Sequence, residues 1–306
     1  MAALKVIPPL SITDSILTSS NVAETDYAAW SSGTTYNIGD RVRYVSTNIH
    51  KVYESLRATN LNHDPTTDTS SPPYWIEVGA TNRWKMFDTI NSTQTTNANS
   101  IVVVVTPGKV VNSVSLLNIE GTSVRIKMTD PTDGIVYDKT TSLTNNGNIN
   151  NWYNYYFNPI QRKTSLVAPD LPAYGTAAIE ITITNTGHTA KCGVCVVGTI
   201  EYIGEGINLG ASVGIQDYSR KEKDDFGNYQ LIQRSYSKKA KFSMAVLNEQ
   251  IDSLQDLLVS LRTTPCVWIG DDRYTSTAIY GYYKDFDITI AYHLVSDCNI
   301  EIEGLT

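Results

Sequence analysis

Residues 178–184 read Ala-Ile-Glu-Ile-Thr-Ile-Thr, with three isoleucines in strict alternation with polar residues. A period of two is the pattern of a β-strand that buries one face and leaves the other in water. Strand-sized apolar pieces lie on both sides of this stretch, separated by Gly, Pro, Asn and Asp, at residues 101–105, 110–117, 123–128 and 195–202. Short strands with such turns are typical of a β-sandwich. We therefore predict a central β-sandwich domain over residues 81–209.

Downstream, residues 210–306 contain the one convincing helical pattern of the chain. Apolar residues recur there at steps of four and three, which places them on one helix face: Leu247, Ile251, Leu254, Leu258 and Leu261. Asn248 is predicted as the N-cap, and Thr263-Thr264-Pro265 ends the helix. Alternating strands flank it at residues 242–246, 266–269, 286–292 and 300–302. This order predicts an α+β unit, an antiparallel sheet with one amphipathic helix laid on it.

Upstream, the pattern changes twice. Residues 1–25 form a lead-in of short apolar pieces ended by Pro8-Pro9 and by a polar run at residues 19–21. Residues 26–80, which we call the aromatic module, are dense in Tyr and Trp. Gly39-Asp40 is predicted to be a turn, after which Val42 and Tyr44 point to one side of a short strand. In so small a unit the aromatic rings must serve as core and as surface.

The composition agrees with a mainly β protein of two or three domains. The chain has 306 residues, of which only 18% are charged, and it has 19 Tyr against 5 Phe. A coiled coil or helical bundle would be richer in Ala, Glu, Lys and Leu. A net charge of −7 argues against a nucleic-acid partner. The longest apolar run is strand-sized, so we expect no membrane insertion. Residues 1–9 do not read as a signal peptide, which predicts synthesis in the cytoplasm without general secretion.

No pattern in the sequence predicts catalysis, a metal or a cofactor. Cys192-Gly193-Val194-Cys195 leads into a strand rather than a helix, so it does not fit a thioredoxin-like site. A zinc site would need two more ligands, and Cys266 and Cys298 are remote. We expect reduced, buried thiols. The sequence has no nucleophile elbow, zinc-protease motif or P-loop. We therefore expect a protein that is not an enzyme.

The aromatic module resembles the small chitin-binding-type carbohydrate modules attached to chitinases. The resemblance lies in Ala29-Trp30, residues 36–44, residues 51–54, Asp64-Pro65 and Tyr74-Trp75. It departs at Asn48-Ile49-His50, where that family usually has a Gly, and at Tyr74, where a second Trp is common. The resemblance implies a glycan or docking surface made of six rings: Trp30, Tyr36, Tyr44, Tyr53, Tyr74 and Trp75. For Trp30 and Tyr53 we favour a place in the core of the module over ligand contact.

The C-terminal block is similar to tail-associated structural proteins of tailed bacteriophages. The matching pieces are residues 214–221, 225–228, 234–239, 267–270, 279–281 and 300–305. In those proteins a carbohydrate-module-like part, a sandwich and such a block occur together, and the strand–helix–strand plan resembles the tail-hub fold. The resemblance implies a virion protein of the tail tip, baseplate or tail hub. Its partners would be other tail proteins, further copies of itself and host-surface glycan. The alternatives are a free carbohydrate-binding accessory protein and a glycan depolymerase.

Overall fold

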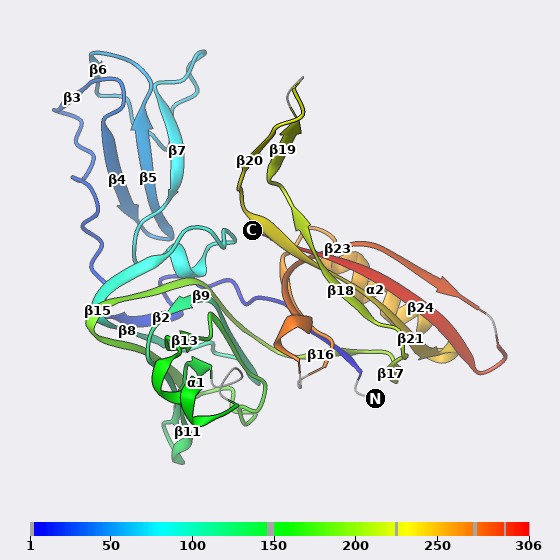
Figure 1. Cartoon of the computed structure of the whole chain (residues 1–306). Helices are drawn as coiled ribbons and strands as arrows, with labels where there is room; N and C mark the ends of the chain where they lie inside the picture. The colour runs from blue at the N-terminus through cyan, green and yellow to red at the C-terminus, as the bar shows by residue number, and fades with distance from the viewer. Residues whose placement is uncertain (1–2, 146–149, 224–225, 272–273, 291, 306) are drawn as a thin grey trace.

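The computed structural model describes residues 3–145, 150–223, 226–271, 274–290 and 292–305 (Figure 1). Asp225 and Ala291, which belong to patterns identified above, lie outside these residues. Strands dominate, and the described residues contain two α-helices, α1 (Trp152–Phe157) and α2 (Ile251–Leu261). Short 3-10 turns occur at η1 (Lys85–Phe87), η2 (Asn248–Gln250) and η3 (Thr275–Thr277). The predicted mainly β fold is confirmed.

The central part is sandwich-like and is organised by one very long strand. Its strands are β2 (Leu17–Ser20), β8 (Thr95–Val105), β9 (Ser113–Glu120), β10 (Ser123–Asp130), β11 (Gly134–Ser142), β12 (Thr144–Asn145), β13 (Gln161–Arg162), β14 (Ser165–Ala168) and β15 (Ala178–Gly198). The first half of β15 pairs with β8 and β10, and its second half pairs with β8 and β9. Both halves contribute to one apolar core.

The alternation that predicted this part is confirmed residue by residue. Ile179, Ile181 and Ile183 are fully buried, and the polar residues between them are half-buried. The strand does not stop there, because β15 continues past a register shift between Thr184 and Thr189. The predicted strand over residues 195–202 is therefore the end of β15, and the chain then enters another sheet.

That other sheet forms the C-terminal unit and has eight strands in the order β16-β1-β22-β23-β24-β21-β17, with β18 also paired to β21. Their bounds are β1 (Leu4–Ile7), β16 (Glu201–Ile203), β17 (Gly206–Ile207), β18 (Ser212–Asp217), β21 (Tyr236–Leu247), β22 (Cys266–Ile269), β23 (Ala278–Thr289) and β24 (Val295–Gly304). The ribbon β19 (Arg220–Lys223) with β20 (Tyr229–Ile232) extends between β18 and β21. Helix α2 lies on one face of this sheet (Figure 1).

The helix follows its predicted pattern on the buried side but not at its start. Leu254, Leu258 and Leu261 are buried in one core with the sheet residues. Asn248 does not cap the helix, since it begins the preceding 3-10 turn. Its side-chain amide instead donates to the carbonyl oxygens of Tyr292 (2.9 Å) and His293 (3.1 Å). Asn248 therefore ties the start of the helix to the loop before β24.

The aromatic module carries the three-stranded sheet β4 (Arg41–Ser46), β5 (Ile49–Ser55) and β7 (Trp75–Ala80). The strands β3 (Thr35–Tyr36) and β6 (Asn60–Leu61) form a separate two-stranded ribbon. Figure 1 shows the module projecting from the rest of the molecule. Its buried cluster consists of only four side chains, Tyr36, Val42, Tyr53 and Trp75.

The lead-in of residues 3–22, which we call the N-terminal arm, joins the two large parts. Strand β1 lies between β16 and β22 of the C-terminal sheet, and β2 pairs with β8 of the sandwich. Between them the Leu10 amide donates to the carbonyl of Val197 at 2.8 Å. Gly198 leaves room for this crossing, because a side chain there would collide with the Pro8 carbonyl. The arm thus holds the sandwich and the C-terminal unit together.

Candidate functional site

The structure divides the six aromatic residues of the predicted glycan surface into two groups. Tyr36, Tyr53 and Trp75 form the core of the module and are 8%, 8% and 5% exposed. The Tyr36 and Trp75 rings meet edge to face with centroids 5.2 Å apart. The Trp75 indole N–H donates to the carbonyl of His63 at 2.9 Å. These three rings are enclosed by protein, which corrects the expectation that they form part of a contact surface.

Trp30, Tyr44 and Tyr74 lie half-buried at the margin of that core. The Trp30 and Tyr44 ring centroids are 5.9 Å apart. Tyr74 is already engaged, since its ring stacks on His63 with the centroids 3.4 Å apart and the guanidinium carbon of Arg57 lies 4.2 Å from its centroid. Trp30 and Tyr44 are therefore the pair that could offer ring area to a ligand.

Asp68 anchors the loop that carries these aromatic residues. Its carboxylate accepts hydrogen bonds from the backbone amides of Tyr74 (2.6 Å) and Ser70 (3.0 Å). Although burial opposes ionisation, these and the other hydrogen bonds hold the pKa of Asp68 below its usual value. The ionised carboxylate therefore fixes where Tyr74 leaves the loop.

His50 links the module to the arm through two carboxyl groups. The Nδ1 atom of His50 lies 2.7 Å from a carboxylate oxygen of Glu24, and its Nε2 atom lies 2.7 Å from one of Asp14. The ring also stacks on Trp84 with centroids 4.2 Å apart. We call this set of four residues the His50 cluster. Its members are scattered along the chain, and no sequence pattern indicated it.

The segment of residues 212–236, formed by β18, β19 and β20 with their connections, exposes apolar side chains on the C-terminal unit. We define the hairpin patch as Val213, Ile215, Tyr229, Leu231 and Ile232, which are between 40% and 69% exposed. Among the described strands β18 pairs only with β21, so its other edge is open. In the sequence, the alternation of Val213 and Ile215 is the pattern that indicates this strand.

A second exposed apolar surface lies on helix α1. Residues 152–157, an aromatic run that follows a polar stretch, fold as this short helix. The Asn151 side chain caps the helix by accepting a hydrogen bond from the Asn154 backbone amide at 2.8 Å. Its five aromatic side chains are between 60% and 77% exposed: Trp152, Tyr153, Tyr155, Tyr156 and Phe157. They contact chiefly one another, as in the Tyr153–Phe157 pair with centroids 4.7 Å apart.

The cysteines have no features of a reactive centre. Cys192 and Cys195 are free, buried thiols in the sandwich core. Burial raises the pKa of Cys195 to about 12 and also raises that of Cys192, so the reactive thiolate form is suppressed. Within the described ranges, no cluster of His, Cys, Asp and Glu is arranged to hold a metal ion. No helix in the same ranges has the length and apolar character to span a bilayer.

Comparison of the chain with known protein families, curated proteins and solved structures found no match. The two resemblances described above therefore stay predictions.

The His50 cluster predicts a pH-dependent effect of Asp14→Asn. A backbone hydrogen bond from Asn48, followed by contacts with His50, lowers the Asp14 pKa from its ordinary 3.8. A lowered pKa means that the carboxylate stabilises the folded state at neutral pH and that this contribution is lost as the pH falls. Because Asp14 is partly exposed, we expect a loss below about 1 kcal/mol at pH 7.

Thermal unfolding, monitored by circular dichroism over a series of pH values, tests this expectation. The loss of stability of the Asp14→Asn variant relative to the wild type, which we call the deficit, should shrink as the pH drops below 3.8. Asp256→Asn, an exposed change on α2, serves as the control and should match the wild type throughout. A deficit of the same size at about pH 2.5 would contradict the role given to the ionised carboxylate.

Proposed function

We propose that this protein is a non-enzymatic structural component that associates with further copies of itself through the hairpin patch. We further propose that it belongs to a phage virion, at the tail tip, baseplate or tail hub. The exposed apolar hairpin with its open strand edge is the observation that carries the first proposal. The likeness of the C-terminal block to tail proteins supports the second.

The physical argument starts from the edge of β18. An open strand edge presents unpaired amide and carbonyl groups that another strand can pair with. Exposed apolar side chains beside such an edge add burial to that pairing, and large exposed apolar surfaces mark contact sites. Val213 and Ile215 lie on the open strand itself, and Leu231 lies on the neighbouring ribbon. A second copy of this chain is the occupant we favour, because the same edge and the same side chains recur on every copy.

The charged residues that flank the hairpin patch favour a specific contact over nonspecific association. Asp217 at the end of β18 pairs with Lys221 at 2.7 Å, and Arg220 pairs with Glu222 at 2.5 Å. Interleaved charges of both signs next to apolar residues penalise a misaligned approach, because like charges would then meet. Pairing of the same edge on two copies is isologous and closes as a two-fold dimer, and such dimers can be units of a larger symmetric ring. Such a ring is the geometry that a tail component needs.

Removing apolar character from the hairpin should break the assembly. We expect the wild type to be oligomeric by light scattering after size exclusion, and the double variant Ile215→Glu, Leu231→Glu to be monomeric. Each buried charge should weaken association by at least about tenfold. Ile135→Glu, an exposed change on β11 of the sandwich, is the matched control and should leave the mass unchanged. A monomeric wild type at about 50 µM, or a double variant that still assembles, would overturn the proposal.

The virion assignment predicts that purified phage particles carrying the corresponding gene contain this chain. Mass spectrometry of the particles should detect it, and a particle reconstruction should place several copies around the tail axis. Purified virions whose protein inventory lacks the chain would refute the assignment. The self-association proposal would survive that result, since it rests on the hairpin alone.

A second candidate function, a carbohydrate-binding protein, is favoured by the half-exposed pair of Trp30 and Tyr44. Aromatic faces stack on the apolar faces of sugar rings. Trp30→Ala should weaken retention on immobilised chitin by about tenfold. The control Ile76→Ala removes an exposed apolar side chain from the opposite sheet face and should leave retention on chitin unchanged. A wild type that binds no member of a glycan panel would exclude this candidate.

A further inference from the structure

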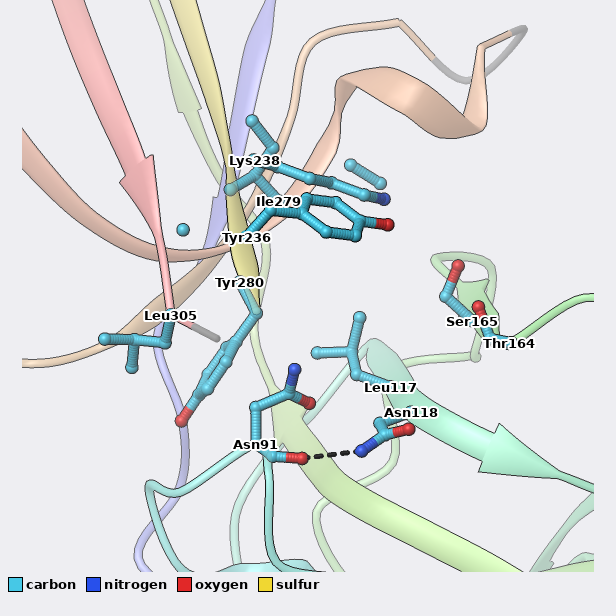
Figure 2. Close-up of a pocket in the computed structure, with 12 residues that line it drawn as sticks. Asn91, Leu117, Asn118, Thr164, Ser165, Tyr236, Lys238, Ile279, Tyr280 and Leu305 are labelled. Atoms are coloured by element: carbon cyan, nitrogen blue, oxygen red, sulfur yellow. Dashed lines mark hydrogen bonds between the residues drawn. The ribbon is translucent and has the colours of Figure 1, made fainter. Parts of the chain in front are cut away.

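A cleft of about 280 Å³ lies between the sandwich and the C-terminal unit. Figure 2 shows its walls, with Tyr236 and Lys238 on one side, Leu117 and Asn91 facing them, and Thr164 and Ser165 beside these. The two sides come from different parts of the fold, since Tyr236 and Lys238 lie on β21 and Leu117 lies on β9. The cleft therefore lies at the joint of the two parts, which the N-terminal arm and the direct packing of Val194 and Val196 with Val267 hold together.

Several polar groups of the cleft have no protein partner, although the Asn118 side-chain amide donates to the Asn91 carbonyl at 2.7 Å. Among the described residues, the ammonium of Lys238 has no ion-pair or hydrogen-bond partner, and no acidic side chain lines the cleft. The hydroxyls of Tyr236, Tyr280 and Ser165 likewise make no hydrogen bond to a described residue. Tyr236 and Lys238 are solvent-exposed, so their polar ends are available to a ligand in the cleft.

Two lysines on the sheets have acidic partners of a kind that Lys238 lacks. Lys241, three residues further along β21, pairs with Glu301 at 2.9 Å, and Lys51 of the module pairs with Glu77 at 2.6 Å. The Lys238 side chain is accessible to solvent, yet partial desolvation by its surroundings lowers its pKa. An anion entering the cleft would offset that penalty by supplying the missing counter-charge.

We propose that this cleft binds a carboxylate-bearing sugar residue of the uronic acid class. The carboxylate would pair with the Lys238 ammonium, and the sugar hydroxyls would bond to the hydroxyls of Tyr236 and Ser165. The ring of Tyr236, with Leu117, offers apolar surface to the C–H groups of the sugar. The volume suits one sugar ring, since it lies just under the range of about 300–1,000 Å³ for drug-sized ligands.

Other ligand classes fit the lining less well. A neutral sugar would leave the ammonium without a counter-charge, and a small inorganic anion would leave the hydroxyls and apolar walls unused. A nucleotide is larger than the space. The inference does not depend on the hairpin patch, because Tyr236 and Lys238 are not members of it.

The test is titration of the full chain with sodium glucuronate, observed by ligand NMR, with glucose and acetate as the matched neutral sugar and simple anion. We expect a Kd of about 1 mM, the affinity ordinary for about thirteen non-hydrogen atoms. Glucose and acetate should each bind at least about tenfold more weakly. Lys238→Gln should weaken glucuronate binding by about tenfold or more, the effect of losing one charge-assisted hydrogen bond.

Two further variants complete the design. Lys239→Gln alters the next residue of the same strand, which points to the opposite sheet face, and should bind like the wild type. Tyr236→Phe removes one hydroxyl and keeps the ring, and should weaken binding severalfold without changing the melting temperature. No detectable glucuronate binding, equal binding of acetate or glucose, or unchanged binding by Lys238→Gln would each overturn the proposal. The oligomeric mass is measured in parallel, so failure here is distinct from failure of self-association.

Discussion

Burial of the N-terminal arm is the interaction on which the arrangement of the whole molecule depends. Leu4 and Val6 are fully buried in the core of the C-terminal unit, and Ile7 is fully buried at the joint with the sandwich. Each such side chain stabilises the assembled state by about 1.5–3 kcal/mol. Units of one chain that meet over modest interfaces usually move against each other. Here the arm places one strand in each unit, and Ile7 packs at the joint together with side chains of both units, which opposes relative motion.

This constraint decides which surfaces can act together. The aromatic module is held by the contact of His50 with Asp14, which belongs to the same arm. The module and the β19–β20 ribbon extend from the same side of the molecule in Figure 1, while the cleft of Figure 2 lies where the two large parts meet. Each of these surfaces is assembled from segments far apart in sequence. A protein that works by contact needs such fixed geometry in the way an enzyme needs a fixed active site.

Local patterns were enough to predict the elements but not their neighbours. The alternation at Ile179 to Ile183 and the leucine spacing from Leu254 to Leu261 report burial on one face, and both were confirmed. The pairing of Val6 with Trp268 leaves no local trace, because any apolar strand could have filled that position. Trp75 was expected on a surface, yet a module with so few apolar residues needs it as core. The lining of the cleft depends on tertiary contact alone, so no motif could have predicted it.

The position of β1 also has a consequence for biosynthesis. The strand is made early but pairs with β22, so it cannot take its place until residues 266–269 have left the ribosome. At about 5–20 residues per second, that wait lasts about 15–50 seconds. The sandwich and the module can form during this time, while Leu4, Val6 and Ile7 stay exposed and the edge of β22 does not yet exist. Pairing of β1 with β22 is therefore a late step, and contacts of such long sequence separation form slowly.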